Sequence, residues 1–189
     1  YGVMTMSQTA HTYPITLAGM PRELRLFEIK PGLKIAILNI LGDTELVEAC
    51  AKALLQKLNT VEYDFLVTAE TKSIPLAHSM AVHAQKPYVV LRKSYKVYMG
   101  KTQQVETLSI TTGAPQILFL DEKDSQAIRG KRIVIVDDVV STGSTLEGIR
   151  KLMNLAGAKV VAEAAICTEG DSTEWENIIH LGELPLFCD

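Results

Sequence analysis

Two carboxylates and a run of small hydroxyl residues follow one short apolar stretch of the chain. Residues 133–136 are β-branched and apolar, Asp137 and Asp138 come next after them, and residues 141–145 read Ser-Thr-Gly-Ser-Thr. An apolar run this short is typical of a strand buried on both faces, and the apolar residues after Thr145 recur at helical spacing. Open α/β sheets bind their ligands at the carboxyl ends of such strands. We therefore expect a ligand site where this strand meets the following helix.

The small residues of this turn favour a phosphate group. At the N-terminus of a helix, unpaired backbone amides and the helix dipole attract anions. Gly143 lets the backbone come close to a ligand, and the neighbouring hydroxyls can donate hydrogen bonds. Asp137 and Asp138 would repel phosphate, but they can accept hydrogen bonds from sugar hydroxyls. The pattern predicts a sugar-phosphate ligand; the alternative is an ordinary helix cap beside two acids that end a strand.

The rest of the chain supplies the elements that must position these residues. Strand and helix patterns alternate: strands are expected at 63–69, 88–93, 132–138 and 159–167, and helices at 44–58, 74–85 and 144–157. This order predicts an α/β fold with a mostly parallel open sheet and helices on both faces. Before the alternation begins, short edge strands are expected at 12–17, 24–29 and 34–41.

The chain is expected to form one domain over residues 1–189. Residues 1–41 make a β-rich N-terminal part, residues 42–167 the core, and residues 168–189 a C-terminal segment that packs on the core or on a partner subunit. Residues 94–130 break the alternation and predict a long flexible hairpin loop followed by a charged run. A long insertion of this kind is typical of an active site.

The composition excludes several classes of protein. The 189 residues are 47% apolar and carry 19 Lys and Arg against 22 Asp and Glu, a net charge of −3. No global field therefore favours nucleic acid or an anionic membrane. Three widely spaced cysteines without a paired metal-ligand pattern indicate buried thiols in a reducing compartment. Because no signal peptide or membrane-spanning run is visible, we expect a cytoplasmic protein without nucleic-acid or membrane partners.

The stretch from Ile133 to Thr145 resembles the phosphoribosyl pyrophosphate signature of type I phosphoribosyltransferases, with four apolar residues, two acids, two apolar residues and a phosphate loop. The resemblance implies that family's fold with a β-rich hood over the site, transfer of phosphoribosyl from phosphoribosyl pyrophosphate to a base, and a homodimer. It implies that Asp137 and Asp138 bind the ribose, take part in catalysis and hold magnesium. The residues implied to bind the 5′-phosphate are Ser141, Thr142, Gly143, Ser144 and Thr145.

Two further stretches are similar to pyrophosphate-binding parts of the family. Residues 68–77 follow an expected strand, and residues 91–101 are rich in lysine and arginine. Family members often hold a non-proline cis peptide in the first stretch, where Lys72 would neutralise the diphosphate. The resemblance also gives Lys96, at the start of the mobile loop, a catalytic role. The pyrophosphate-binding residues that it implies are Glu70, Thr71, Lys72, Ser73, Arg92, Lys93 and Lys96.

The expected base depends on finer differences. Orotate enzymes carry an arginine shortly after the phosphate loop, where this chain has Glu147, which would repel the orotate carboxylate. The mobile loop is more similar to those of adenine and xanthine phosphoribosyltransferases, so a purine is expected, with adenine favoured over xanthine or another oxopurine. The sequence departs from the usual adenine enzyme at 72–74 and 143–145. We place the base pocket among residues 26–40 and 169–175.

Two readings stand beside a purine salvage enzyme. Repressors of the same fold sense phosphoribosyl pyrophosphate and regulate transcription, but they carry an N-terminal DNA-binding domain. Here roughly 40 residues precede the core, they read as β, and the net charge is negative, so we favour the enzyme. An inactive relative of the family is the other alternative. The mechanism needs no covalent nucleophile, and His78 and His83 are interpreted as packing or surface residues.

Overall fold

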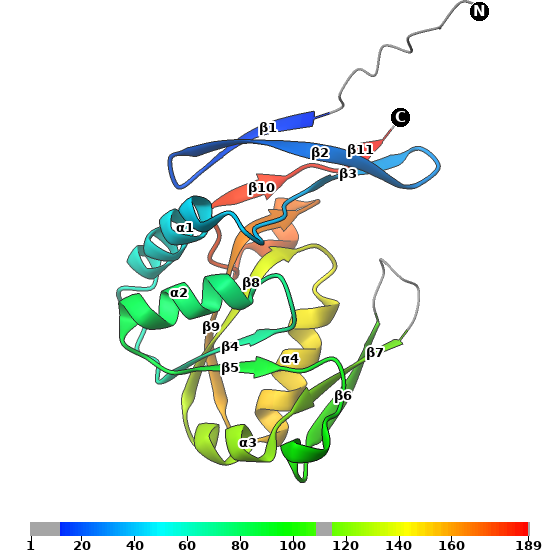
Figure 1. Cartoon of the computed structure of the whole chain (residues 1–189). Helices are drawn as coiled ribbons and strands as arrows, with labels where there is room; N and C mark the ends of the chain where they lie inside the picture. Colours follow the sequence, from blue (N-terminus) through cyan, green and yellow to red (C-terminus); the bar gives the residue numbers. More distant parts are fainter. Residues whose placement is uncertain (1–11, 109–114, 189) are drawn as a thin grey trace, which may run out of the picture.

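A five-stranded parallel sheet forms the centre of the molecule. The computed structural model describes residues 12–108 and 115–188, and the strands of this sheet run in the order β10-β9-β8-β4-β5 (Figure 1). Their bounds are Gly182–Leu184 (β10), Lys159–Glu169 (β9), Arg132–Val140 (β8), Phe65–Ala69 (β4) and Tyr88–Leu91 (β5). Every neighbouring pair is parallel. The predicted α/β fold with a parallel sheet is therefore confirmed.

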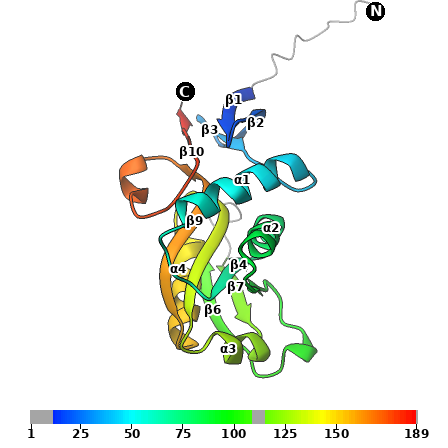
Figure 2. The same cartoon turned by 90° about the vertical axis from the view of Figure 1, so that its left-hand side faces the viewer.

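Helices cover both faces of this sheet. Their bounds are Thr44–Lys57 (α1), Ile74–Ala84 (α2), Glu122–Ile128 (α3) and Ser144–Leu155 (α4). One buried cluster joins the apolar sides of α1 and α2 to the sheet, and a second joins α4 to the opposite face. Figure 2 shows the sheet edge-on between α2 and α4. Among the described residues, no helix is long and apolar enough to cross a membrane.

The central strand β8 owes its position to its side chains. Residues 133–136 are 0% exposed, because β4 and β9 flank the strand and helices cover it from both sides. β-branched residues suit such a surface, and burying each side chain stabilises the fold by about 1.5–3 kcal/mol. The sheet therefore holds the carboxyl end of β8, where Asp137 and Asp138 stand, in a fixed place.

A second, four-stranded antiparallel sheet lies beyond the amino end of α1 (Figure 1). Its strands, in the order β1-β2-β3-β11, are Thr12–Leu17, Met20–Lys30, Leu33–Ile37 and Phe187–Cys188. Arg22 of β2 donates hydrogen bonds to Asp43 at 2.7 and 2.9 Å, and Asp43 caps α1 by accepting from the amide of Leu46 at 3.2 Å. One carboxylate thus both starts the helix and fastens the second sheet to the core.

A β-hairpin, formed by β6 (Gln103–Leu108) and β7 (Pro115–Leu120), packs beside α4. Arg92, just after β5, exchanges backbone hydrogen bonds of 2.9 and 2.8 Å with Phe119 of β7. The hairpin of the sequence prediction therefore has a described stem, and its tip, residues 109–114, lies outside the described residues.

Two short helices stand in the region that follows β5. The charged run at 121–130 has no pattern that predicts an element, whereas the structure has α3 there. Asp121 caps this helix through the amide of Lys123 at 2.8 Å, and Ser125 and Ile128 are buried. A short 3-10 helix, η1 (Val97–Met99), precedes β6. Capping and two inward-facing residues were enough to form α3, although its sequence shows no long apolar period.

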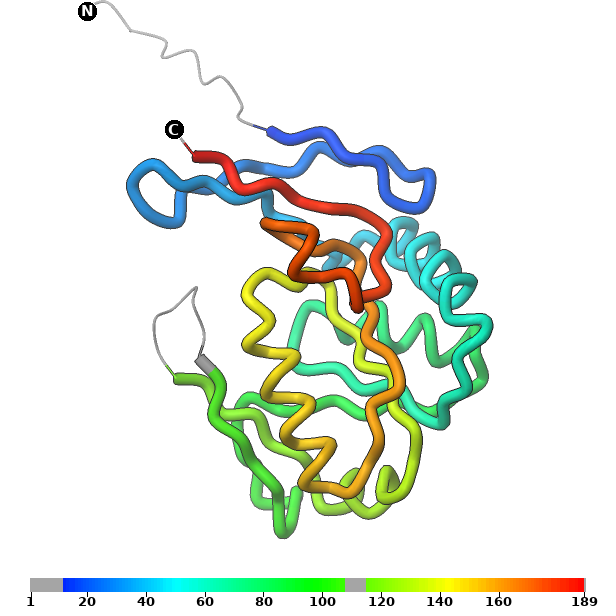
Figure 3. Tube along the Cα trace, turned by 180° about the vertical axis from the view of Figure 1, so that it is seen from behind, coloured from blue at the N-terminus to red at the C-terminus, as the bar shows by residue number. Residues whose placement is uncertain are grey.

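The C-terminal segment returns to both sheets of the chain (Figure 3). After β9 come a 3-10 helix, η2 (Ser172–Trp175), then β10 beside β9 and β11 beside β3. Of the two partners that the sequence left open, this segment contacts its own chain. It thereby links the parallel sheet to the antiparallel one.

Candidate functional site

A cavity of about 580 Å³ opens at the carboxyl ends of β8 and β9. Five parts of the chain line it: the end of β2 with β3, the loop between β4 and α2, the stem of the hairpin, the turn from β8 into α4, and the segment after β9. Its volume is within the range of about 300–1,000 Å³ that small-molecule sites occupy. Its position, at the carboxyl edge of a parallel sheet, is where such sheets bind ligands.

Two carboxylates at the end of β8 face this cavity. Asp138 is 7% exposed, and its Oδ2 lies 3.0 Å from Nζ of Lys72. This ion pair lacks the angles of a hydrogen bond, so the buried Oδ2 has no hydrogen-bond partner among the described residues. The amide of Asp138 donates to Oδ1 of Asp137 at 2.8 Å. Burial, and next the charge of Asp138, hold the pKa of Asp137 well above its ordinary value.

The turn after these acids has the geometry of an anion site. Gly143 has a φ of +75° and stands directly before the first residue of α4, Ser144. Glycine has no side chain to cap a helix, and the one side-chain contact of the first amides among the described residues is a long one, from the amide of Ser144 to the hydroxyl of Thr142 at 3.5 Å, which a ligand can replace. Ser141 and Thr142 are exposed, and both line the cavity. The turn therefore offers amides and hydroxyls to a phosphate group beside the two carboxylates.

Lys72 brings a positive charge to the same space from a different strand. It belongs to the loop between β4 and α2, and the ends of this loop are joined by a hydrogen bond of 2.8 Å from the hydroxyl of Thr68, on β4, to that of Ser73, the N-cap of α2. The peptide bond between Glu70 and Thr71 is cis, as the resemblance to phosphoribosyltransferases leads one to expect. Nζ of Lys72 lies near Asp138 and also donates to the carbonyl of Leu38 at 3.4 Å.

The comparisons with known proteins agree with this arrangement. The model of the phosphoribosyl transferase domain matches residues 37–179, which include β8, its two carboxylates, the turn into α4 and Lys72. The chain belongs to this family. The match thus covers β4, β5, β8 and β9 of the parallel sheet, and β10 lies after it. It also covers the lining of the cavity except for the end of β2, the beginning of β3 and Leu186.

Curated relatives of this domain include regulators and enzymes. The chain is 28% identical over 161 residues to the purine biosynthesis transcriptional repressor PurR of Bacillus subtilis, covering 82% of this chain and 56% of the repressor. It is 32% identical over 128 residues to the hypoxanthine/guanine phosphoribosyltransferase of Methanococcus voltae, covering 68% of this chain and 64% of that enzyme. The chain therefore spans less than two thirds of the length of these relatives.

Solved structures share the fold of this domain. The adenine phosphoribosyltransferase of Thermoanaerobacter pseudethanolicus superposes with a TM-score of 0.70 at 21% identity, covering 85% of this chain and 95% of that one. The adenine phosphoribosyltransferase of Saccharomyces cerevisiae, with adenine and an imino-altritol bisphosphate bound, gives 0.68 at 19% identity, covering 84% and 93%. At these identities the similarity concerns the fold.

The structure does not bring every expected site residue into the cavity. Its described lining includes Asp137, Asp138, residues 141–145 and Lys72. It does not include the other residues expected to bind pyrophosphate, which are Glu70, Thr71, Ser73, Arg92, Lys93 and Lys96.

The basic stretch after β5 is occupied by contacts of its own. The guanidinium of Arg92 donates to Glu70 and, at 3.3 Å, to the hydroxyl of Tyr98. The other oxygen of Glu70 accepts from the amide of Lys93 at 2.8 Å. The amide of Lys96 lies 3.3 Å from the sulfur of Met99, a buried residue of η1. Just after η1, the amide of Lys101 donates to Glu122 at the start of α3. This stretch therefore lies against α3, and it is outside the described lining of the cavity. Of the residues expected in the cationic wall, Lys72 is the one found in the described lining of the cavity.

Other residues line the cavity that the motifs did not single out. Thr107 and Gln116 reach it from the stem of the hairpin, and the apolar side chains of Ile29, Ile35 and Ile37 from the antiparallel sheet. The three isoleucines lie within 26–40, and the lining residues 169–171 and Glu174 lie within 169–175; these are the two stretches where we expected the base pocket. The spacing of residues along the chain could not show that these side chains line one cavity, because they come from the hairpin stem, the antiparallel sheet and the segment after β9.

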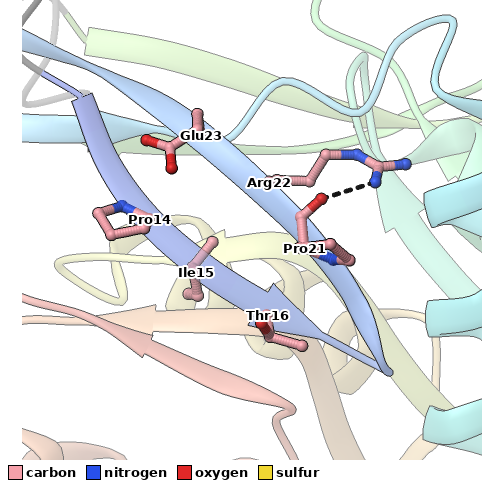
Figure 4. Close-up of a pocket in the computed structure, with 6 residues that line it drawn as sticks. All are labelled: Pro14, Ile15, Thr16, Pro21, Arg22 and Glu23. Carbon is pink, nitrogen blue, oxygen red and sulfur yellow. Dashed lines mark hydrogen bonds between the residues drawn. The ribbon is translucent and has the colours of Figure 1, made fainter.

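A smaller hollow, of about 290 Å³, lies on the hairpin of β1 and β2 (Figure 4). It is lined by Ile15, Thr16, Glu23, Arg22 and two prolines. Arg22 is committed to Pro21, whose carbonyl accepts from it at 2.8 Å, and to the carboxylates of the α1 cap. The hollow therefore offers no free cation and no convergent set of polar groups among its described residues, and the larger cavity is the candidate site.

Proposed function

We propose that the chain is a purine phosphoribosyltransferase, which moves the phosphoribosyl group of phosphoribosyl pyrophosphate to a ring nitrogen of a purine. The bond from C1 of the ribose to the base forms, and the bond from C1 to pyrophosphate breaks. The observation that carries the proposal is the cavity at the end of β8, which gathers two carboxylates, an uncapped helix N-terminus and Lys72 around one space. Membership in the phosphoribosyl transferase domain family supports it.

The roles of the residues follow from their chemistry. The amides and hydroxyls of residues 141–145 would bind the 5′-phosphate, and Asp137 and Asp138 would accept hydrogen bonds from the ribose hydroxyls. Lys72 would neutralise the diphosphate. Since Lys72 now pairs with Asp138, a diphosphate that attracts Lys72 leaves the buried Oδ2 free for the sugar. In the complex, Lys72 would then pair with the diphosphate, and Asp138 would accept hydrogen bonds from the ribose.

Magnesium is part of the proposal and the donor set fits it. No group of three or more acidic, histidine or cysteine side chains that could hold a metal occurs among the described residues. Magnesium usually binds through one or two carboxylates together with substrate phosphates. Asp137 and Asp138 provide such a pair, and Oδ2 of Asp138 has no hydrogen-bond partner among the described residues. When bound, the ion would neutralise charge on the leaving diphosphate.

A neutral base with hydrogen-bond donors suits the remaining walls. Ile35, Ile37 and their neighbours form an apolar side, whereas Glu169, Asp171 and Glu174 bring carboxylates. Burial raises the pKa of Glu169. An anionic base such as orotate would be repelled there, while the amino group of adenine could donate to a carboxylate. We therefore propose adenine as the acceptor, with hypoxanthine and guanine, the bases named for the Methanococcus relative, as the competing choice.

Pyrophosphate release tests this function. The enzyme is supplied with phosphoribosyl pyrophosphate, magnesium and, separately, adenine, hypoxanthine, guanine, xanthine, orotate or uracil. We expect turnover with adenine and loss of at least about 100-fold in kcat/KM in Asp138→Asn, because that variant loses a charge aimed at the ribose. Glu147→Gln is the matched control, since Glu147 is exposed, lies outside the described cavity lining and forms a surface ion pair with Lys151 across one turn.

The match to PurR supports a second candidate, a sensor of phosphoribosyl pyrophosphate. A sensor would bind phosphoribosyl pyrophosphate, and so gain thermal stability, without releasing pyrophosphate with any base. Turnover with a purine would exclude this candidate as the sole function. The resemblance also leads us to propose a homodimer, which sedimentation equilibrium tests.

A further inference from the structure

Trp175, the single tryptophan of the chain, lies directly behind the turn proposed to bind the 5′-phosphate. A Cβ placed on Gly143 would be 3.1 Å from both Cη2 and Cζ3 of the indole. The ring therefore touches the backbone at the position where α4 begins. Figure 3 shows the segment after β9 beside the start of this helix.

The indole is itself held at its other end. Its Nε1 donates to the carbonyl of Glu169 at 3.0 Å, and the ring packs against the buried cluster under α4. The 3-10 helix that carries it is capped by Asp171, which accepts from the amide and hydroxyl of Thr173 at 2.9 and 2.8 Å. Trp175 is thus fixed by a hydrogen bond, by packing and by a capped turn.

Both residues to which it is attached, Gly143 and Glu169, line the cavity. Glu169 and Asp171 line it on the side where the base is proposed to bind, and Gly143 lines it on the phosphate side. The left-handed φ of Gly143, +75°, is a conformation that glycine adopts without strain. Other turn conformations are therefore open to this residue, and a flat ring behind it restricts how far the turn can move away from the cavity.

We propose that Trp175 is a positioning residue: it holds the turn of residues 141–145 in the shape that receives the 5′-phosphate and ties that turn to the base side of the cavity. This inference rests on one part of the proposed function, the binding of a sugar phosphate at this turn, and does not depend on transfer to a base. Trp175 does not touch the reacting atoms. Its effect is on the place of Gly143 and of the amides that follow it.

The test measures two ligands that would bind at different ends of the cavity. Ribose 5-phosphate would bind to the turn that Trp175 supports, and inorganic pyrophosphate with magnesium to the loop of Lys72. Both affinities are measured by calorimetry for the wild-type protein, Trp175→Phe and Trp175→Leu. Since displacing a binding group by about 1 Å can cost up to roughly 100-fold, we expect Trp175→Leu to weaken ribose 5-phosphate by about tenfold. Pyrophosphate affinity should change less than about twofold.

Trp175→Phe and a distant control separate positioning from general loss of packing. Phenylalanine keeps a ring behind Gly143 but cannot donate to the carbonyl of Glu169, so its affinity for ribose 5-phosphate should lie between those of the other two proteins. Phe187→Leu removes a ring that packs on Tyr13 in the antiparallel sheet, at a centroid distance of 5.5 Å. Its affinity for ribose 5-phosphate should equal that of the wild type.

The wild-type protein also reports on the turn directly, because all tryptophan fluorescence comes from Trp175. Titration with ribose 5-phosphate should change the emission. The inference is overturned if Trp175→Leu binds ribose 5-phosphate as the wild type does, or if it loses both ligands by the same factor. If the wild type binds ribose 5-phosphate but turns over no base, the enzymatic proposal fails and this one stands. If the wild type binds no ribose 5-phosphate, both fail.

Discussion

The contact between α4 and the hairpin stem permits a prediction with a worked magnitude. Gly148, the fifth residue of α4, is buried against β6, and a Cβ there would lie 2.1 Å from Cγ2 of Thr107. Carbon atoms in contact are about 3.5–4.0 Å apart. Thr107 cannot easily turn away, because it is 8% exposed and its hydroxyl donates to the carbonyl of Gln116 at 3.0 Å. Gly148→Ala must therefore push the hairpin away from the helix.

The expected cost combines two opposing terms. Overpacking of this kind costs about 1–3 kcal/mol, and replacing glycine by alanine inside a helix returns up to about 1 kcal/mol. We expect Gly148→Ala to lower the free energy of unfolding by about 1–2 kcal/mol, and the melting temperature by roughly 2–8 °C for a chain of this size. Urea titration and thermal melting of the ligand-free protein measure both quantities.

A compensating change identifies the cause. Thr107→Ser deletes the methyl group that the new Cβ would strike and keeps the hydroxyl bonded to Gln116. The double variant with Gly148→Ala should be more stable than Gly148→Ala alone, because it keeps the helix gain without the clash. A Gly148→Ala protein as stable as the wild type, or a double variant no better than the single one, would refute this account of the packing.

Two carboxylates lead to predictions of opposite sign. The raised pKa of Asp137 means that its contribution to stability is full below its unfolded pKa, near 4, and is lost as pH rises through the folded value. Asp137→Asn should therefore raise the melting temperature of the ligand-free protein at pH 7 and flatten its decline above pH 4; a lower melting temperature at pH 7 would contradict this. Hydrogen bonds from Arg132 lower the pKa of Asp64 to about 2, so its contribution is present above pH 4 and is lost as pH falls toward 2. Asp64→Asn should melt at a lower temperature than the wild type at pH 7, with the difference shrinking between pH 4 and 2; a difference independent of pH would sink the assignment.

Much of the fold and part of the site could be predicted because the relevant signals are local. A strand, two acids and a glycine turn stand consecutively in the chain, so the strand-turn-helix that carries Asp137, Asp138 and Gly143 follows from their spacing alone. Lys72 was implied by the resemblance of residues 68–77 to a pyrophosphate loop at the end of a strand, and the ends of neighbouring parallel strands meet at one edge. That edge is where the structure places it.

Contacts between distant segments could not be predicted from the spacing of residues along the chain. Nothing in the order of residues indicates that the stretch around η1 lies against the start of α3, where the amide of Lys101 donates to Glu122, because an insertion that leaves the sheet is not constrained by the alternation of strands and helices. The helix α3 has too few apolar residues to show a period. The approach of Trp175 to Gly143 joins two turns, each of which follows a different strand. Such contacts depend on packing in three dimensions.

The contrast between Asp137 and Asp64 bears on function as well as stability. Asp64 pairs with Arg132, so the fold has satisfied its charge. Asp137 is set beside a second acid at the end of a buried strand, where burial and repulsion both oppose its charge. The charge of such a carboxylate lowers the free energy of unfolding of the ligand-free protein. Sugar hydroxyls and a cation that bind to it would offset this loss, which is typical of carboxylates at binding sites. Ribose 5-phosphate with magnesium should therefore stabilise the wild type more than Asp137→Asn at pH 7, and equal stabilisation of the two proteins would show that Asp137 has no part in the site.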